Sequence, residues 1–219
     1  MSMSYEEAAR EQYMEDLYEE HRKEAIEEFT FECLSSYYRE NKQLAKPAFE
    51  ALSDARELSA FNPTASLVFA SIAMEVGLKA ILLKPIVYGL VHTDSVASLI
   101  TDLALAHTGM DRYKKLLLHL LRDHGGVDLD TFTRSGSKKT LWGEISEIQT
   151  SRNAIMHRAE KGSPEMAQLA LAVASEIIDH IFPDIVGRMG FHLHDGYRIC
   201  SDQRCRFKGT PFEQYFQST

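Results

Sequence analysis

The sequence predicts an all-α fold: an up-and-down four-helix bundle core with added N-terminal helices and a small C-terminal β-hairpin. Apolar residues recur every three or four positions through most of the 219 residues, as on one face of an amphipathic helix. Proline, asparagine and glycine separate these stretches, where helices begin and end. Strand-like alternation occurs only around Asp195-Gly196, a dipeptide typical of hairpin turns.

Each expected helix follows from its apolar spacing and its flanking residues. The expected helices are Ser4–Tyr38, Pro47–Ser59, Ala65–Lys84, a short one from Thr93 or Ser95 to Ala106, Asp111–His124, Lys138–Arg152, and one from Pro164 to Pro183. Asn62 or Thr64 can cap the third of these, and Gly125-Gly126 stops the fifth. Pro85 and Pro183 mark the ends of the two most apolar helices.

The remaining segments are predicted to be irregular or extended. Residues 127–137 form the longest irregular loop, and residues 153–163 form a polar connection between two helices. Two or three short strands are expected within 191–207. The chain then divides into an acidic N-terminal helical extension (1–61), a helical bundle (62–186) and a C-terminal hairpin and tail (187–219).

The net charge of −8 lies entirely in the N-terminal segment. Residues 1–60 hold 15 acidic and 7 basic residues, whereas residues 61–219 hold 17 of each. Such an acidic segment most simply forms an added layer on the bundle. Alternatively, it could mimic nucleic acid and shield the basic motif, or it could mediate assembly of the protein. Residues 134–161 are locally basic, with six basic and three acidic residues.

Composition argues against a membrane protein or a secreted one. The most apolar stretch, 65–91, is interrupted by Glu75, Lys79 and Lys84, so no uncharged run of 18 residues occurs. The N-terminus lacks the basic and apolar regions of a signal peptide. Three cysteines without disulfide-like spacing fit a reducing compartment, so we expect a cytoplasmic protein with no membrane partner.

Arg152-Asn153-Ala154-Ile155-Met156-His157 is the motif with the clearest chemistry. Arginine can donate a bidentate pair of hydrogen bonds to phosphate oxygens, and histidine can gain or lose a proton near neutral pH. Metal-free RNA cleavage requires a base, an acid and cations around the phosphate. One motif supplies a single histidine, so two copies at a two-fold axis would complete such a site.

The chain resembles the HEPN superfamily, small helical domains of prokaryotic toxins, phage-defence systems and CRISPR-associated ribonucleases. The resemblance covers roughly residues 62–186. It rests on the apolar helix with Ala73-Met74-Glu75-Val76-Gly77-Leu78-Lys79, on Arg152-Asn153 and His157, and on the long helix that follows. It implies a four-helix bundle, a homodimer, and metal-independent endoribonuclease activity without cofactors.

By this resemblance, Arg152 and His157 form the catalytic pair and Asn153 is the polar residue that commonly follows the arginine. Glu75 and Lys79 are candidate supports from the first core helix, and Arg158 is a candidate for a further phosphate contact. RNA and a neutralising antitoxin or defence partner are implied. Ala159 stands where a subset of the family has a modified tyrosine, so that regulation is not expected.

Two alternatives to this interpretation stay open. Arg152 could cap the preceding helix or pair with Glu144, Glu147 or Glu160, and His157 could simply be solvated. The domain could also be a non-catalytic dimeric adaptor or sensor that binds nucleic acid, nucleotide or a partner protein.

The C-terminal tail holds four residues of the types that bind zinc: His192, His194, Cys200 and Cys205. They lack the two matched pairs common in structural zinc sites, and Asp195-Gly196 fits a plain hairpin with free thiols equally well. No metal is therefore assigned from the sequence.

Overall fold

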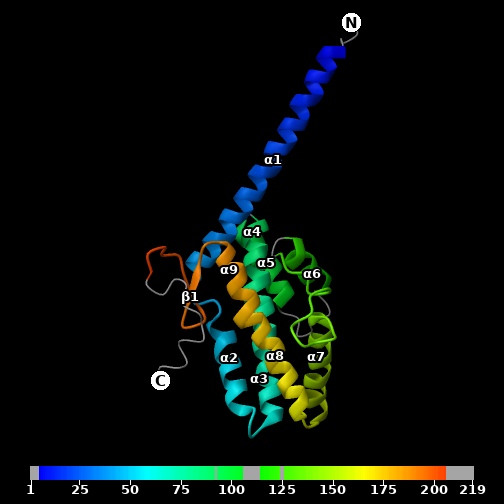
Figure 1. The fold of residues 1–219 in the computed structure, drawn as a ribbon, viewed down its shortest axis with the longest axis vertical. Coiled ribbons are helices and arrows are strands. Elements are labelled where there is room, and N and C mark those ends of the chain that lie inside the picture. The colour runs from blue at the N-terminus through cyan, green and yellow to red at the C-terminus, as the bar shows by residue number, and fades with distance from the viewer. Residues whose placement is uncertain (1–4, 92, 106–113, 124–125, 206–219) are drawn as a thin grey trace.

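The computed structural model describes residues 5–91, 93–105, 114–123 and 126–205. It has the predicted class, since it is all-α apart from one small antiparallel hairpin near the C-terminus (Figure 1). The helix limits predicted at Ser4, Ala106, Asp111 and His124, and the tail beyond residue 205, lie outside the described residues.

The helices are α1 (Tyr5–Glu40), α2 (Lys46–Leu58), α3 (Pro63–Val76), η1 (Gly77–Leu83), α4 (Lys84–Leu90), α5 (Asp94–Leu105), α6 (Lys114–Asp123), α7 (Leu141–Arg158), α8 (Pro164–Ser175), η3 (Glu176–Ile181) and α9 (Phe182–Arg188). The strands are β1 (His192–His194) and β2 (Arg198–Cys200). The segments η1 and η3 are π-helical and continuous with their neighbours.

Four helices, α2, α3, α7 and α8, lie side by side and alternate in direction (Figure 1). Short connections join α2 to α3 and α7 to α8, which favours antiparallel neighbours. Ala48, Leu52 and Ala55 of α2 are buried in the same core as the later helices. The hydrophobic core therefore includes part of the acidic N-terminal segment.

The two central helices continue through the prolines that were predicted to end them. One helix runs over Pro63–Leu90 and another over residues 164–188, so the ends expected at Pro85 and Pro183 are wrong. A π-helical segment precedes each proline: the N–H of Lys84 donates to the carbonyl of Lys79, five residues back. The wider turn relieves the clash between a proline ring and the preceding turn.

Tyr38 supplies a donor that Pro85 cannot. Proline has no N–H, so the carbonyl of Ile81, four residues earlier, loses its ordinary helical partner. The Tyr38 hydroxyl donates to this oxygen at 2.8 Å, and the side chain is fully buried. Its ring also lies 6.4 Å from that of Phe182, which precedes the second helical proline. Tyr38 thus fastens the end of α1 to both central helices.

The two π-helical segments meet at Gly77. A Cβ atom at this position would lie only 3.1 Å from Cγ2 of Ile177 and 3.5 Å from Cγ1 of Ile178. Glycine therefore allows η1 and η3 to approach more closely than a side chain would permit. An ion pair between Arg56 of α2 and Asp179 of η3 joins a third helix to this contact.

The N-terminal part of α1 projects away from the bundle as a long arm (Figure 1). Leu34 and Tyr38, near its end, are buried against the core, whereas Tyr13, Tyr18 and Ile26 are exposed. The end of α1 forms an added layer on the bundle, as one interpretation of the acidic segment expects, whereas α2 is itself one of the four bundle helices. Within the described residues, the arm itself covers no core face.

The helix α7 is longer than predicted. Thr140 caps its start by accepting a hydrogen bond from the Gly143 N–H at 3.2 Å. The helix was expected to end at Arg152, but it continues to Arg158 because Ala154 and Ile155 extend its apolar face into the core. Ala159, with φ of 54°, ends it in the left-handed conformation.

The irregular loop before α7 is held by one buried carboxylate. Arg134 donates to both oxygens of Glu144, at 2.8 and 3.0 Å, and the Ser137 hydroxyl adds a third hydrogen bond at 2.7 Å. Glu144 is only 3% exposed. Since a buried carboxylate needs partners, this network fixes the loop against the start of α7.

The helix Pro63–Leu90 is long and apolar enough to cross a membrane, the one such helix among the described residues. A core helix meets this test as well as a membrane span does. Here 67% of the most apolar 18-residue window is buried inside the fold, as expected of a core helix.

Replacing Tyr38 by phenylalanine is expected to lower the free energy of unfolding by about 1–3 kcal/mol, because the buried carbonyl of Ile81 loses its donor. Chemical denaturation measures this loss. The matched control is Tyr18→Phe on the exposed arm, which should change stability little. An equal effect of both substitutions would contradict the role of Tyr38.

The same hydroxyl makes stability depend on alkaline pH. Burial, and secondarily the neighbouring Tyr37, raises the pKa of Tyr38, while burial and Tyr88 raise the pKa of Tyr37 to about 12. The folded state therefore keeps protons that the unfolded chain loses above about pH 10, so stability falls as pH rises past that value. The fall should be shallower in Tyr38→Phe.

Replacing Arg134 by alanine is expected to cost about 3 kcal/mol or more, because the buried Glu144 side chain loses its ion-pair partner and two hydrogen bonds. Lys139→Ala, which breaks an exposed ion pair with Glu147 on the same helix, should cost less than about 1 kcal/mol. Thermal and urea unfolding of both variants test the difference, and equal losses would refute it.

Candidate functional site

Arg152, Asn153 and His157 all lie on α7, which packs against α3 and α8. The end of α7 is anchored because the Gly162 N–H, in the following loop, donates to the Thr64 hydroxyl of α3 at 3.0 Å. The position of the motif relative to the bundle is therefore set by the fold.

Arg152 and His157 do not point in the same direction on this helix. Five residues correspond to a rotation of about 140° and a rise of about 7.5 Å. Arg152 is half-buried, whereas His157 is exposed. No hydrogen bond or ion pair joins them within the described part of the chain, so one copy of α7 does not form a closed Arg–His pair.

Asn153 lies between the two in angle and directs the arginine outward. Nη1 of Arg152 donates to Oδ1 of Asn153 at 3.2 Å. Asn153 is exposed and precedes His157 by four residues, so the two share one face of the helix. The guanidinium therefore leans toward the exposed face that carries His157.

The acidic residues that could have paired with Arg152 all have other partners. Glu144 binds Arg134, Glu147 binds Lys139 at 2.6 Å, and Glu160 binds Arg158 at 2.7 Å. The alternative in which one of them holds Arg152 is therefore not the pairing that the structure has. Among the described residues no carboxylate contacts this guanidinium, and its charge is available to an anion.

The predicted supporting residues have partners of their own. Glu75 and Lys79 form an ion pair with each other, with Lys79 largely buried, and Glu75 does not contact Arg152. The support expected from Glu75 is therefore not formed. Arg158 pairs with Glu160 on the surface, where both side chains are mostly exposed.

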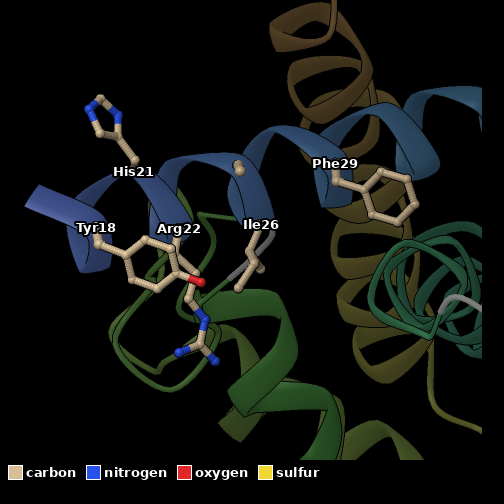
Figure 2. A pocket seen from close by; sticks show the side chains of 6 residues that line it. Tyr18, His21, Arg22, Ile26 and Phe29 are labelled. Carbon is tan, nitrogen blue, oxygen red and sulfur yellow. The ribbon is translucent and has the colours of Figure 1, made fainter. Parts of the chain in front are cut away.

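The arm of α1 carries a shallow groove that the sequence did not single out. It is lined by Tyr18, His21, Arg22, Ala25, Ile26 and Phe29. Figure 2 shows Tyr18, Arg22 and Ile26 on one side of the helix and His21 on the other. The sequence pattern that could have revealed this groove is the spacing of apolar residues every three or four positions within a charged helix. All of these side chains lie on α1, so the groove is a surface separate from that of α7.

The four candidate metal ligands of the tail come together. His192, His194, Cys200 and Cys205 present their ligand atoms within 4.8 Å of one another, and all four side chains are half-buried. The Nε2 atoms of the two histidines are 3.2 Å apart, and that of His194 lies 3.0 Å from Sγ of Cys205. Their spacing along the sequence did not reveal this convergence.

Comparison with known proteins found no relative of this chain. No family model, no curated protein and no solved structure matches the chain.

Proposed function

We propose that the protein is a metal-independent endoribonuclease that acts as a homodimer, with a composite site made of Arg152 and His157 from two copies of α7. The observation that carries the proposal is that no carboxylate among the described residues pairs with the Arg152 guanidinium. Every nearby acidic residue named above is paired elsewhere, while Asn153 holds the guanidinium toward the exposed face of α7. A phosphate would supply the missing anion.

The dimer follows from what one copy lacks. Cleavage by this chemistry requires a base and an acid on opposite sides of the phosphate, and one motif has a single histidine. Two copies related by a two-fold axis would supply two imidazoles and two guanidiniums. Met156, one residue before His157, is 55% exposed on the same part of α7, which fits a surface that a second copy covers.

The reaction then balances without a metal ion. One imidazole takes the proton of the ribose 2′-hydroxyl, whose oxygen attacks the phosphorus, and the bond from phosphorus to the 5′-oxygen breaks. The second imidazole gives a proton to that leaving oxygen. The products are a 2′,3′-cyclic phosphate and a free 5′-hydroxyl, while the Arg152 guanidiniums bind the charged non-bridging oxygens.

The chain as purified should cleave single-stranded RNA in EDTA and leave 2′,3′-cyclic phosphate ends. Arg152→Ala and His157→Ala should each lower the rate by about 10²-fold or more, since each removes a group used in the transition state. Arg39→Ala and His180→Ala, at exposed positions on other helices, are the matched controls and should keep the wild-type rate. Product ends are read by mass spectrometry.

Folded protein that leaves RNA intact would contradict the proposal and favour the non-catalytic adaptor. Cleavage that requires added metal, or that survives both substitutions on α7, would equally place the activity elsewhere.

The composite site also predicts a dependence on protein concentration. Because two copies build one site, activity per chain should fall on dilution once dimers dissociate. Sedimentation equilibrium gives the dissociation constant, and the activity midpoint should coincide with it. Undiminished activity from a species that sediments as a monomer would rule out the shared site.

A further inference from the structure

The C-terminal hairpin carries three candidate ligands on one face. In the antiparallel register, His192 is paired with Cys200 and His194 with Arg198. Side chains two residues apart on a strand point to the same side, so these four residues share a face. The alternate residues, Leu193 and Ile199, face the core, where Ile199 is 2% exposed.

The hairpin is firmly docked, so that this face has a defined position. The Ile199 N–H donates to the carbonyl of Lys42 at 2.9 Å, in the connection between α1 and α2. The ring of Tyr197 lies 5.4 Å from that of Phe49 on α2. The ligand-bearing face therefore points away from the bundle on a rigid support.

A turn brings the fourth ligand over this face. The Cys205 N–H donates to the carbonyl of Asp202 at 3.2 Å, and the Arg204 N–H donates to the Asp202 carboxylate at 2.9 Å. Gln203 reaches back to the carbonyl of Gly190, at the start of the hairpin, at 3.1 Å. Cys205 is thereby placed against His194 although eleven residues separate them.

We propose that His192, His194, Cys200 and Cys205 bind one Zn²⁺ ion in a closed tetrahedral site. With ordinary zinc–ligand lengths, the ligand atoms of such a site are about 3.3–3.8 Å apart. The observed 3.2 Å between imidazole nitrogens and 3.0 Å from nitrogen to sulfur lie close to that range, and all four atoms fall within 4.8 Å. Small side-chain shifts close the tetrahedron.

The donor set selects the metal. Two imidazole nitrogens and two thiolates suit zinc, whereas magnesium and calcium prefer oxygen. Two thiolates also neutralise the charge of the ion. A hydrogen-bonded chain from His192 through His194 to Cys205 would explain three of the residues but gives Cys200 no role.

The site has four protein ligands and no open position for a substrate, so it is structural. It would tie the turn at 202–205 to the hairpin, close to the end of the described chain. This role is independent of the proposed ribonuclease, because the hairpin and α7 lie on opposite sides of the bundle (Figure 1).

Metal analysis of the full chain, purified without chelator, tests the proposal. About one zinc ion per chain is expected from a closed four-ligand site. His194→Ala and Cys205→Ser should each lose most of the bound zinc. Cys33→Ser is the matched control, since Cys33 lies on α1 and is the one cysteine outside the cluster, and it should keep the metal. Circular dichroism establishes that each variant retains its helices.

Cobalt(II) gives a second readout on the unmutated chain. After the protein is stripped of metal, added cobalt should produce the intense visible bands of a tetrahedral site and a thiolate charge-transfer band. Cys200→Ser should weaken that band. Binding should also weaken at low pH, because protons compete for both thiolates and imidazoles.

Two results would overturn the proposal. One is metal-free protein that takes up neither zinc nor cobalt while its thiols remain reactive. The other is a Cys200–Cys205 disulfide, seen as a loss of two hydrogens in the unreduced mass. Neither assay involves RNA, so its outcome is separate from that of the ribonuclease test.

Discussion

The hydrogen bond from Tyr38 to the carbonyl of Ile81 is the interaction on which the core arrangement depends. Both central helices contain a proline, and each continues because a π-helical segment precedes it. The carbonyl that Pro85 leaves without its usual donor would be costly to bury, and a tyrosine from a distant helix satisfies it. Because both helices continue through their prolines, their π-helical segments can meet closely at Gly77.

Charge pairing on α7 determines what its exposed face can do. Three carboxylates along and beyond this helix are taken by Arg134, Lys139 and Arg158. Arg152 is left with an amide as its partner, which orients the guanidinium without neutralising it. A cation in this state, on the same helix as an exposed histidine, is suited to binding a phosphate ester, and this is the physical basis of the proposed ribonuclease.

The two proposed sites differ in how they are built. The site proposed on α7 is open, and one chain supplies a single histidine, so the proposed reaction would need a second copy. The cluster on the hairpin is closed within one chain, because strand alternation and one turn bring four ligands together. A closed set of four protein ligands fits a structural role, which is why the zinc ion proposed for the tail is a structural one.

The sequence by itself determined the helical class, most helix positions and the hairpin, because apolar periodicity and turn residues act locally. It also identified Arg152, His157 and the four tail residues as chemically capable. Only the tertiary structure decided that the helices pass through Pro85 and Pro183, that α7 reaches Arg158, and that Glu144 belongs to Arg134. These outcomes depend on contacts between residues far apart in the chain, such as Tyr38 with Ile81, and no local pattern encodes them.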